Sequence, residues 1–216
     1  REVSYMIRLA QQDDAERLLE IQQGVLKEQQ HLITTIHEFF QTIEGLKAWI
    51  RLKLENKRET ILVAEVDGNV VGWLVLQSQN RERLAHIGII SMMVEKAYRC
   101  RGIGEELLGA LLLWAEENPF IEKVSGSVLS TNNGAIALYK KMGFSEEGRK
   151  VDEVKIHNTY IDEILLYKIT KRRENHGATV RSRYHIKGRW PHQGKAVCRP
   201  EHLHLRGSDL PFSQRL

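Results

Sequence analysis

The chain has 216 residues, of which 42% are hydrophobic and 28% charged, a composition ordinary for one globular domain with a sizeable core. Two distant cysteines exclude a disulfide framework and fit a reducing, cytoplasmic compartment, while no apolar run reaches membrane-spanning length and residues 1–10 lack a signal-peptide core. The net charge of +4 is uneven, because residues 1–170 are net acidic and residues 171–216 are strongly basic.

The first third of the chain predicts a strand, two helices and a hairpin. Residues 7–9 favour a short strand, and apolar residues then recur at helical spacing in residues 15–21 and 39–54. Asp13 or Asp14 is expected to cap the first of these helices. Two apolar strands, 61–66 and 70–76, flank the turn Asp67-Gly68-Asn69, which predicts an antiparallel hairpin.

The remaining pattern alternates strands and helices as far as residue 169. Its expected elements are a strand 87–94, a helix 102–117, a strand 121–129, a helix 133–142 and two strands, 145–156 and 159–169. Pro119 limits the longer helix and Gly143 ends the shorter one. The order is therefore βααβββαβαββ, which by periodicity alone is α/β or α+β.

Residues 171–216 differ in character from the rest. They hold most of the prolines and histidines and show no apolar period, so we expect a basic, disordered or non-native extension after a domain of residues 1–170. Residues 1–5 precede Met6 and are expected to be a cloning remnant. Cys198, His202 and His204 lack a second nearby cysteine, so no metal site is predicted. The tail also lacks the interleaved aromatic residues of a nucleic-acid binder.

A basic, glycine-containing turn joins the strand 87–94 to the following helix. It reads Tyr98-Arg99-Cys100-Arg101-Gly102-Ile103-Gly104. Gly102 and Gly104 allow unusual backbone dihedrals and close approach to a ligand. The free N–H groups at the start of the helix suit a phosphate anion, and the arginines add positive charge. The Gly-x-Gly-x-x-Gly and P-loop spacings are absent, which argues against a dinucleotide or P-loop site.

A second motif, Asn132-Asn133-Gly134-Ala135-Ile136-Ala137-Leu138-Tyr139-Lys140-Lys141-Met142-Gly143-Phe144, follows about thirty residues later. With the Arg-x-x-Gly-x-Gly turn it resembles the GNAT superfamily of N-acetyltransferases, and the looser likeness runs from about Ile7 to Ile169. The resemblance implies the GNAT acyl-CoA N-acyltransferase fold, a mixed, mainly antiparallel sheet flanked by helices. It also implies an acetyl-CoA-dependent N-acetyltransferase that uses no metal.

The resemblance assigns roles to particular positions. The residues that it places at the cofactor are Met92, Met93, Val94, Arg99, Cys100, Arg101, Gly102, Ile103, Gly104, Glu105, Asn132 and Tyr139. Backbone N–H groups from Cys100 to Glu105 would hold the pyrophosphate, and one N–H from the strand would polarise the thioester carbonyl. Asn132 is open between a helix N-cap and a cofactor contact. Tyr139 is the expected general acid, with a core aromatic as the alternative.

The general base is left open. No carboxylate occurs in Ile87–Val94, and His86 is ~26 Å from Val94 along an extended strand. The remaining candidates are Glu28, Glu65, Glu95 and Asp162, and a water relay is favoured over each of them.

The acceptor cannot be identified from the residues. By the resemblance, residues 28–39 and 154–158 shape its side of the site, and the acceptor is a small-molecule or protein amine. A homodimer is left open. The alternatives in other classes are a non-catalytic acyl-CoA sensor, which the missing strand carboxylate supports, and a nucleic-acid binder that uses the basic tail.

Overall fold

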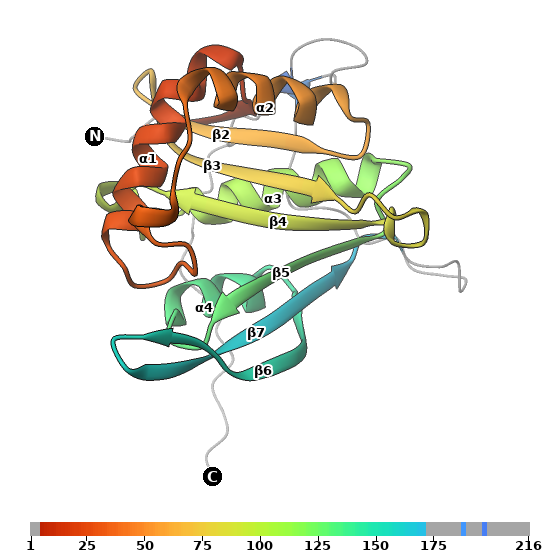
Figure 1. Cartoon of the computed structure of the whole chain (residues 1–216). Coiled ribbons are helices and arrows are strands. Elements are labelled where there is room, and N and C mark those ends of the chain that lie inside the picture. The colour runs from red at the N-terminus through yellow and green to blue at the C-terminus, as the bar shows by residue number, and fades with distance from the viewer. Residues whose placement is uncertain (1–4, 172–186, 189–195, 198–216) are drawn as a thin grey trace, which may run out of the picture.

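The computed structural model describes residues 5–171, 187–188 and 196–197, so Cys198, His202 and His204 lie outside the described residues. A seven-stranded sheet has the order β1-β2-β3-β4-β5-β7-β6 (Figure 1). Its strands are β1 (Tyr5–Leu9), β2 (Thr60–Val66), β3 (Asn69–Ser78), β4 (Ile87–Val94), β5 (Lys123–Leu129), β6 (Ser145–Ile156) and β7 (Thr159–Ile169). All neighbours are antiparallel except β4 and β5, which confirms the predicted mixed, mainly antiparallel sheet.

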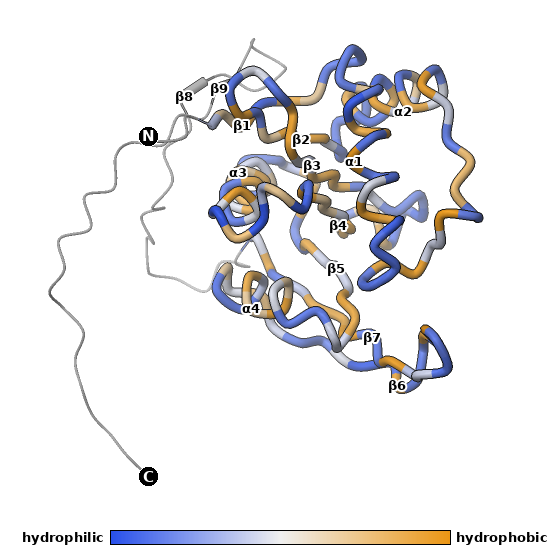
Figure 2. Tube along the Cα trace, turned by 90° about the vertical axis from the view of Figure 1, so that its left-hand side faces the viewer, coloured by the Kyte–Doolittle hydropathy of each residue, from blue (hydrophilic) through white to orange (hydrophobic). Residues whose placement is uncertain are grey.

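The four α-helices in the described part of the chain cover the sheet unevenly. Helices α1 (Ala15–Lys27) and α2 (Ile43–Glu55) lie on one face, and α3 (Ile103–Glu117) and α4 (Asn133–Lys141) lie on the other (Figure 2). Helices α1 and α2 pack over the β2–β4 side of the sheet, whereas no helix of the described residues covers β5, β7 and β6 on that face. None of the helices that the structure describes has the length and apolar character needed to cross a membrane.

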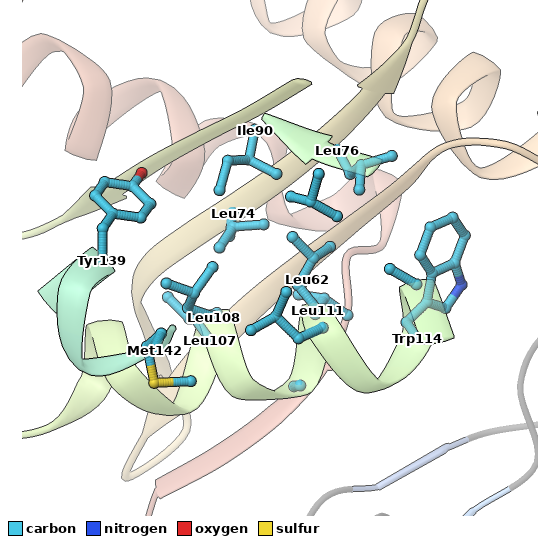
Figure 3. Close-up of a cluster of buried hydrophobic side chains, with 14 of the residues drawn as sticks. Leu62, Leu74, Leu76, Ile90, Leu107, Leu108, Leu111, Trp114, Tyr139 and Met142 are labelled. Carbon is cyan, nitrogen blue, oxygen red and sulfur yellow. The ribbon is translucent and has the colours of Figure 1, made fainter. Parts of the chain in front are cut away.

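Two apolar cores form because successive strand residues point to opposite faces of the sheet. Leu62, Leu74 and Leu76 face α3, where Leu107, Leu108 and Leu111 are directed at them (Figure 3). Val63 and Trp73 face the other way and pack with residues of α1 and α2, among them Leu18, Ile21 and Ile50. The first core continues under α4 through Tyr139, Met142 and Phe144. The predicted order of elements is thus confirmed, since both periodicities report real burial.

One local prediction is wrong and another is confirmed only in part. The second helix begins at Ile43 rather than near Phe39, because Thr42 caps it by accepting a 3.1 Å hydrogen bond from the N–H of Gly45. Phe40 consequently lies outside the helix and is 88% exposed. Asp14 is the N-cap residue of α1, as expected, but its side chain makes no cap bond; the carboxylate instead accepts two bonds, of 2.7 and 2.8 Å, from the guanidinium of Arg8.

Periodicity did not predict three features, two at the ends of the domain and one at the start of β5. Tyr5, within the segment expected to be a remnant, belongs to β1 and pairs with Val66 of β2. Beyond residue 171, β8 (Lys187–Gly188) and β9 (Ala196–Val197) form a separate two-stranded sheet. Near the start of the fifth strand, Ile121 precedes β5 but is fully buried, so its apolar character reflects the core rather than the sheet.

Candidate active site

The parallel strands β4 and β5 separate partway along their length. Their register comprises the pairs Ile87↔Lys123, Gly88↔Val124 and Ile89↔Ser125, after which β4 continues along β3 and β5 continues along β7. Figure 1 shows the two arrows diverging. Strand backbone that has no neighbour presents N–H and C=O groups that can pair with an extended ligand. The opening therefore offers two strand edges to a chain-like molecule.

Ile90 and Gly126 mark the point of divergence. A Cβ placed on Gly126 would lie 3.2 Å from Cγ1 of Ile90, so the isoleucine side chain sits against the glycine backbone. An isolated glycine inside a strand pattern can indicate such a close approach, and this was the one sequence signal of the divergence. Sequence reasoning did not include either residue in the site.

The turn before α3 has the backbone of an anion site. Gly102 is the N-cap of α3 with a left-handed φ of 85°, and Cys100, which is exposed, has a φ of 59°. A Cβ on Gly102 would meet nothing within 4 Å, so the approach to the helix N-terminus is open at this residue. The first N–H groups of a helix have no intrahelical partners and lie at its positive end. Cys100 and Gly102 thus lie in the turn and Ile103 to Glu105 begin α3, so the backbone N–H groups of this stretch can donate to phosphate oxygens.

The two arginines of this turn are placed differently. The guanidinium of Arg101 lies 5.4 Å from the centroid of the Tyr98 ring, in a cation–π contact. Arg99 donates two hydrogen bonds of 2.7 Å to the carboxylate of Glu28 and one of 2.9 Å from Nε to the carbonyl of Val94. The charge of Arg99 is therefore already balanced by a carboxylate, a pairing that no local sequence pattern predicts.

The predicted strand residues divide between the two faces of β4. Met92 and Val94 pack against the core under α3, and Met93 packs against the core under α1 and α2. A Cβ on Gly104 would lie 3.2 Å from Leu138 of α4 and 3.5 Å from Cε of Met92. The absence of a side chain at Gly104 thus lets the start of α3, β4 and α4 meet closely.

Asn132 and Tyr139 lie near opposite ends of α4. The side-chain oxygen of Asn132 accepts a 3.1 Å bond from the N–H of Ala135, so its N-cap role is confirmed. Tyr139 is 6% exposed and packs edge-on against Phe144, with ring centroids 5.2 Å apart. Figure 3 shows its ring extending from α4 with the hydroxyl oxygen at the far end. Burial raises the pKa of Tyr139 to about 12, so the phenol keeps its proton at neutral pH.

The four candidate bases each have an arginine partner. Glu28 pairs with Arg99 at 2.7 Å, Glu65 with Arg8 at 2.7 Å, Asp162 with Arg149 at 3.2 Å, and Glu95 with Arg17. The hydrogen bond from Arg99 lowers the pKa of Glu28. A bond from the backbone N–H of Asp152, followed by Arg149, lowers the pKa of Asp162. Glu28 and Asp162 are therefore weaker proton acceptors than a free carboxylate.

The uncovered face of the sheet lies opposite Tyr139. Ile90, Val124 and Val128 are buried toward α3 and α4, so the alternate residues Ile89, Ser91 and Ser127 belong to the other face. All three are exposed, and Figure 2 shows no helix beside β5, β7 and β6 on that side. The connection between α1 and α2, residues 28–42, is next to this face and contains a single short 3-10 turn, Ile36–Glu38.

Comparison with known proteins gives consistent likenesses. A sequence model described as the Acetyltransferase (GNAT) family matches residues 25–144. An N-alpha-acetyltransferase from Sulfurisphaera tokodaii is 31% identical over 150 residues, covering 66% of this chain and 81% of that protein.

Solved structures agree with the sequence comparison. The GNAT-family acetyltransferase from Streptococcus pneumoniae superposes with a TM-score of 0.73 at 25% identity, covering 76% of this chain and 99% of that one. The acetyltransferase yncA from Salmonella typhimurium, solved with its cofactor acetyl-CoA, has a TM-score of 0.71 at 18% identity and covers 81% of this chain and 97% of its own, a likeness of fold alone.

Proposed function

The chain belongs to the GNAT family of acetyltransferases, and from this premise we propose that it transfers the acetyl group of acetyl-CoA to a primary amine by direct attack in a ternary complex. The observation that carries the proposal is the divergence of β4 and β5 beside a helix N-terminus whose N-cap is a left-handed glycine. The two features together suit an extended chain that ends in a pyrophosphate.

On the cofactor side, the pantetheine would lie along the free edges of β4 and β5. Backbone N–H groups of Cys100 to Glu105 would receive the pyrophosphate, and Arg101 would add charge at the rim. Met92, Met93 and Val94 would line the strand, and one of their N–H groups would polarise the thioester carbonyl. Asn132 would contact the cofactor near the start of α4, in addition to its role as N-cap.

Tyr139 would supply the proton that the leaving group needs. When the C–S bond of the thioester breaks, the sulfur leaves with the electron pair, and the phenol would donate its proton to that thiolate. The raised pKa of Tyr139, about 12, supports a donor that is fully protonated at neutral pH. Solvent would return the proton to the tyrosine after the product leaves.

The incoming ammonium would first lose a proton to water to give the neutral amine, and after attack the nitrogen of the tetrahedral intermediate would lose a second proton to water. Since Glu28, Glu65, Glu95 and Asp162 all engage arginines, a water relay on the uncovered face fits the arrangement better than any of these carboxylates. The neutral amine attacks from that face while Tyr139 acts from beneath α4. Proximity and polarisation of the carbonyl would account for most of the rate.

The test is an amine panel with detection of the acetylated products by mass. The panel contains a free amino acid, a peptide with a free N-terminus, an N-terminally blocked lysine peptide and an aminoglycoside. We expect acetyl-CoA to be consumed with at least one of them, and the reaction without amine controls for hydrolysis. Stabilisation of the protein by acetyl-CoA without transfer to any amine would contradict the proposal and favour the acyl-CoA sensor.

A further inference from the structure

Two arginine–glutamate pairs cross between helix α1 and the segment that joins β4 to α3. Arg17 of α1 reaches Glu95, and its Nε donates a 2.8 Å bond to the carbonyl of Val70. In the opposite direction, Arg99 reaches back to Glu28 at the end of α1. Helix α1 therefore contributes an arginine to one pair and a glutamate to the other, and these two residues lie near opposite ends of the helix. The two pairs fix both ends of α1 to this segment.

Arg99 connects three parts of the site. Its two terminal nitrogens bind the two oxygens of Glu28, and its Nε binds the carbonyl of Val94 at the end of β4. A guanidinium bound in this forked way has a fixed plane, which gives the pair directional specificity as well as attraction. The end of β4, the turn before α3 and the end of α1 are therefore held in one relative position.

The position of Glu28 is unfavourable for the helix itself. Glu28 is the C-cap of α1, where a carboxylate meets the negative end of the helix dipole, and the next residue, Gln29, has a φ of 51°. Local helix preference therefore does not explain a glutamate here. The tertiary pair with Arg99 does explain it, and Glu28 is the more buried partner, with 15% of its side chain exposed against 33% for Arg99.

We propose that Glu28 is a positioning residue that, through Arg99, holds the start of the 28–42 connection against the turn before α3. This inference rests on the proposed function, because it takes the 28–42 connection as the acceptor side and the turn as the cofactor side. The pair then fixes the distance between the two substrates. Glu28 does not accept the proton of the amine.

The alternative is that Glu28 is the general base. Besides Arg99, the positively charged or titratable groups that act on it are Lys96 and His31, and all three favour the ionised carboxylate. A general base gives the acid limb of a pH–rate profile, whereas a positioning residue changes the Michaelis constant of the substrate that it helps to place.

The first experiment measures hydrogen exchange of the ligand-free protein in peptides that cover residues 26–42. Glu28→Gln keeps the shape of the side chain but removes its charge, and Arg99→Lys keeps the charge but removes the fork. We expect both variants to exchange about tenfold faster there than the wild type. Arg17→Lys is the matched control, because it replaces the guanidinium whose single bond to Glu95 makes the other pair, and it should leave this region unchanged.

The second experiment uses an amine that supports turnover. For Glu28→Gln and Arg99→Lys we expect the KM for that amine to rise about tenfold, within the ~100-fold that a misplacement of about 1 Å can cause, with an unchanged acid limb of the pH profile. The double variant should be no worse than the more affected single variant, because both remove one pair. Arg17→Lys should leave the KM for the amine within about twofold, because partly exposed ion pairs usually contribute little.

Two outcomes would overturn the inference. Loss of the acid limb with a fall in kcat in Glu28→Gln would make Glu28 the base, and unchanged exchange in both variants would show that the pair holds nothing. Hydrogen exchange needs no acceptor, so it decides the role of the pair even if no amine is acetylated. Failure of every amine would contradict the proposed function alone.

Discussion

Gly102 combines a backbone requirement with an open approach, and the two can be separated by substitution. Its left-handed φ of 85° strains most residues, but nothing lies within 4 Å of a Cβ placed there. Asparagine is among the residues that best tolerate this conformation, and aspartate has nearly the same shape. The pair Gly102→Asn and Gly102→Asp therefore differs mainly in charge.

We expect Gly102→Asp to weaken CoA binding by roughly 100-fold or more relative to Gly102→Asn, because like charges about 4 Å apart repel by up to about 4 kcal/mol in a partly screened site. Titration calorimetry with CoA measures the difference, and melting temperatures without ligand check that both variants fold. Equal affinities for CoA would remove this turn from the proposed pyrophosphate site.

Tyr139 offers a second test on a single residue. Tyr139→Phe keeps the ring and its contact with Phe144 but removes the hydroxyl. If the phenol is the general acid, kcat should fall by roughly 10² to 10⁴ with CoA affinity little changed. Turnover within about threefold of the wild type, well below the usual general-acid effect, would return Tyr139 to a packing role.

The same substitution has a pH signature in stability. The pKa of Tyr139 rises on folding from 10.0 to about 12, so folding favours the neutral phenol. This contribution is fully present below pH 10 and is lost as the pH rises toward 12. In denaturant melts, the wild type should therefore lose stability across this window relative to Tyr139→Phe. Parallel losses in the two proteins would show that the phenol is not buried as described.

At the scale of elements, periodicity predicted most of the architecture because it records burial. Leu62 and Val63 point into two different cores, and the apolar run that serves both cores is what predicts β2 as a strand. Phe39 and Phe40 extended the predicted second helix too far, because apolar residues in a connection can continue a helical spacing. Thr42 caps the helix after them, so both residues lie outside it. Glu28 and Arg99 meet across 71 residues of sequence, and no local pattern encodes which charges will pair at that separation.

The pairing of β3 with β4 depends on a glycine. A Cβ on Gly88 would lie 2.5 Å from Cδ2 of Leu76, which is fully buried, so Gly88→Ala forces that leucine to move. We expect a destabilisation of about 1–3 kcal/mol, as for other overpacked cores. Urea unfolding of Gly88→Ala, Leu76→Ala and the double variant measures it. The double variant should lose less stability than the sum of the singles, and strict additivity would contradict the close contact.

At the scale of the molecule, the boundary near residue 170 is a proposal. Thr170 still belongs to the domain, since its N–H donates a 2.9 Å bond to the carbonyl of Glu122. We expect removal of residues 171–216 to change the melting temperature by less than about 3 °C and to leave CoA affinity unchanged, because that segment has no apolar periodicity with which to join the core. Scanning fluorimetry of the two chains makes the comparison. A large loss would mean that the tail completes the fold.

The sheet consists of two panels, β1-β2-β3-β4 and β5-β7-β6, which are joined by the short pairing of β4 with β5. Three register pairs connect β4 to β5, whereas β3–β4 and β5–β7 are paired over most of their lengths. A ligand bound between the free edges of β4 and β5 would extend the connection between the two panels and make them unfold together. In scanning calorimetry we therefore expect the van't Hoff enthalpy of the ligand-free protein to fall below its calorimetric enthalpy, and acetyl-CoA to bring the two into agreement. Equal enthalpies without ligand would show that the shared core already unites the panels, so that the substrate adds stability but no cooperativity.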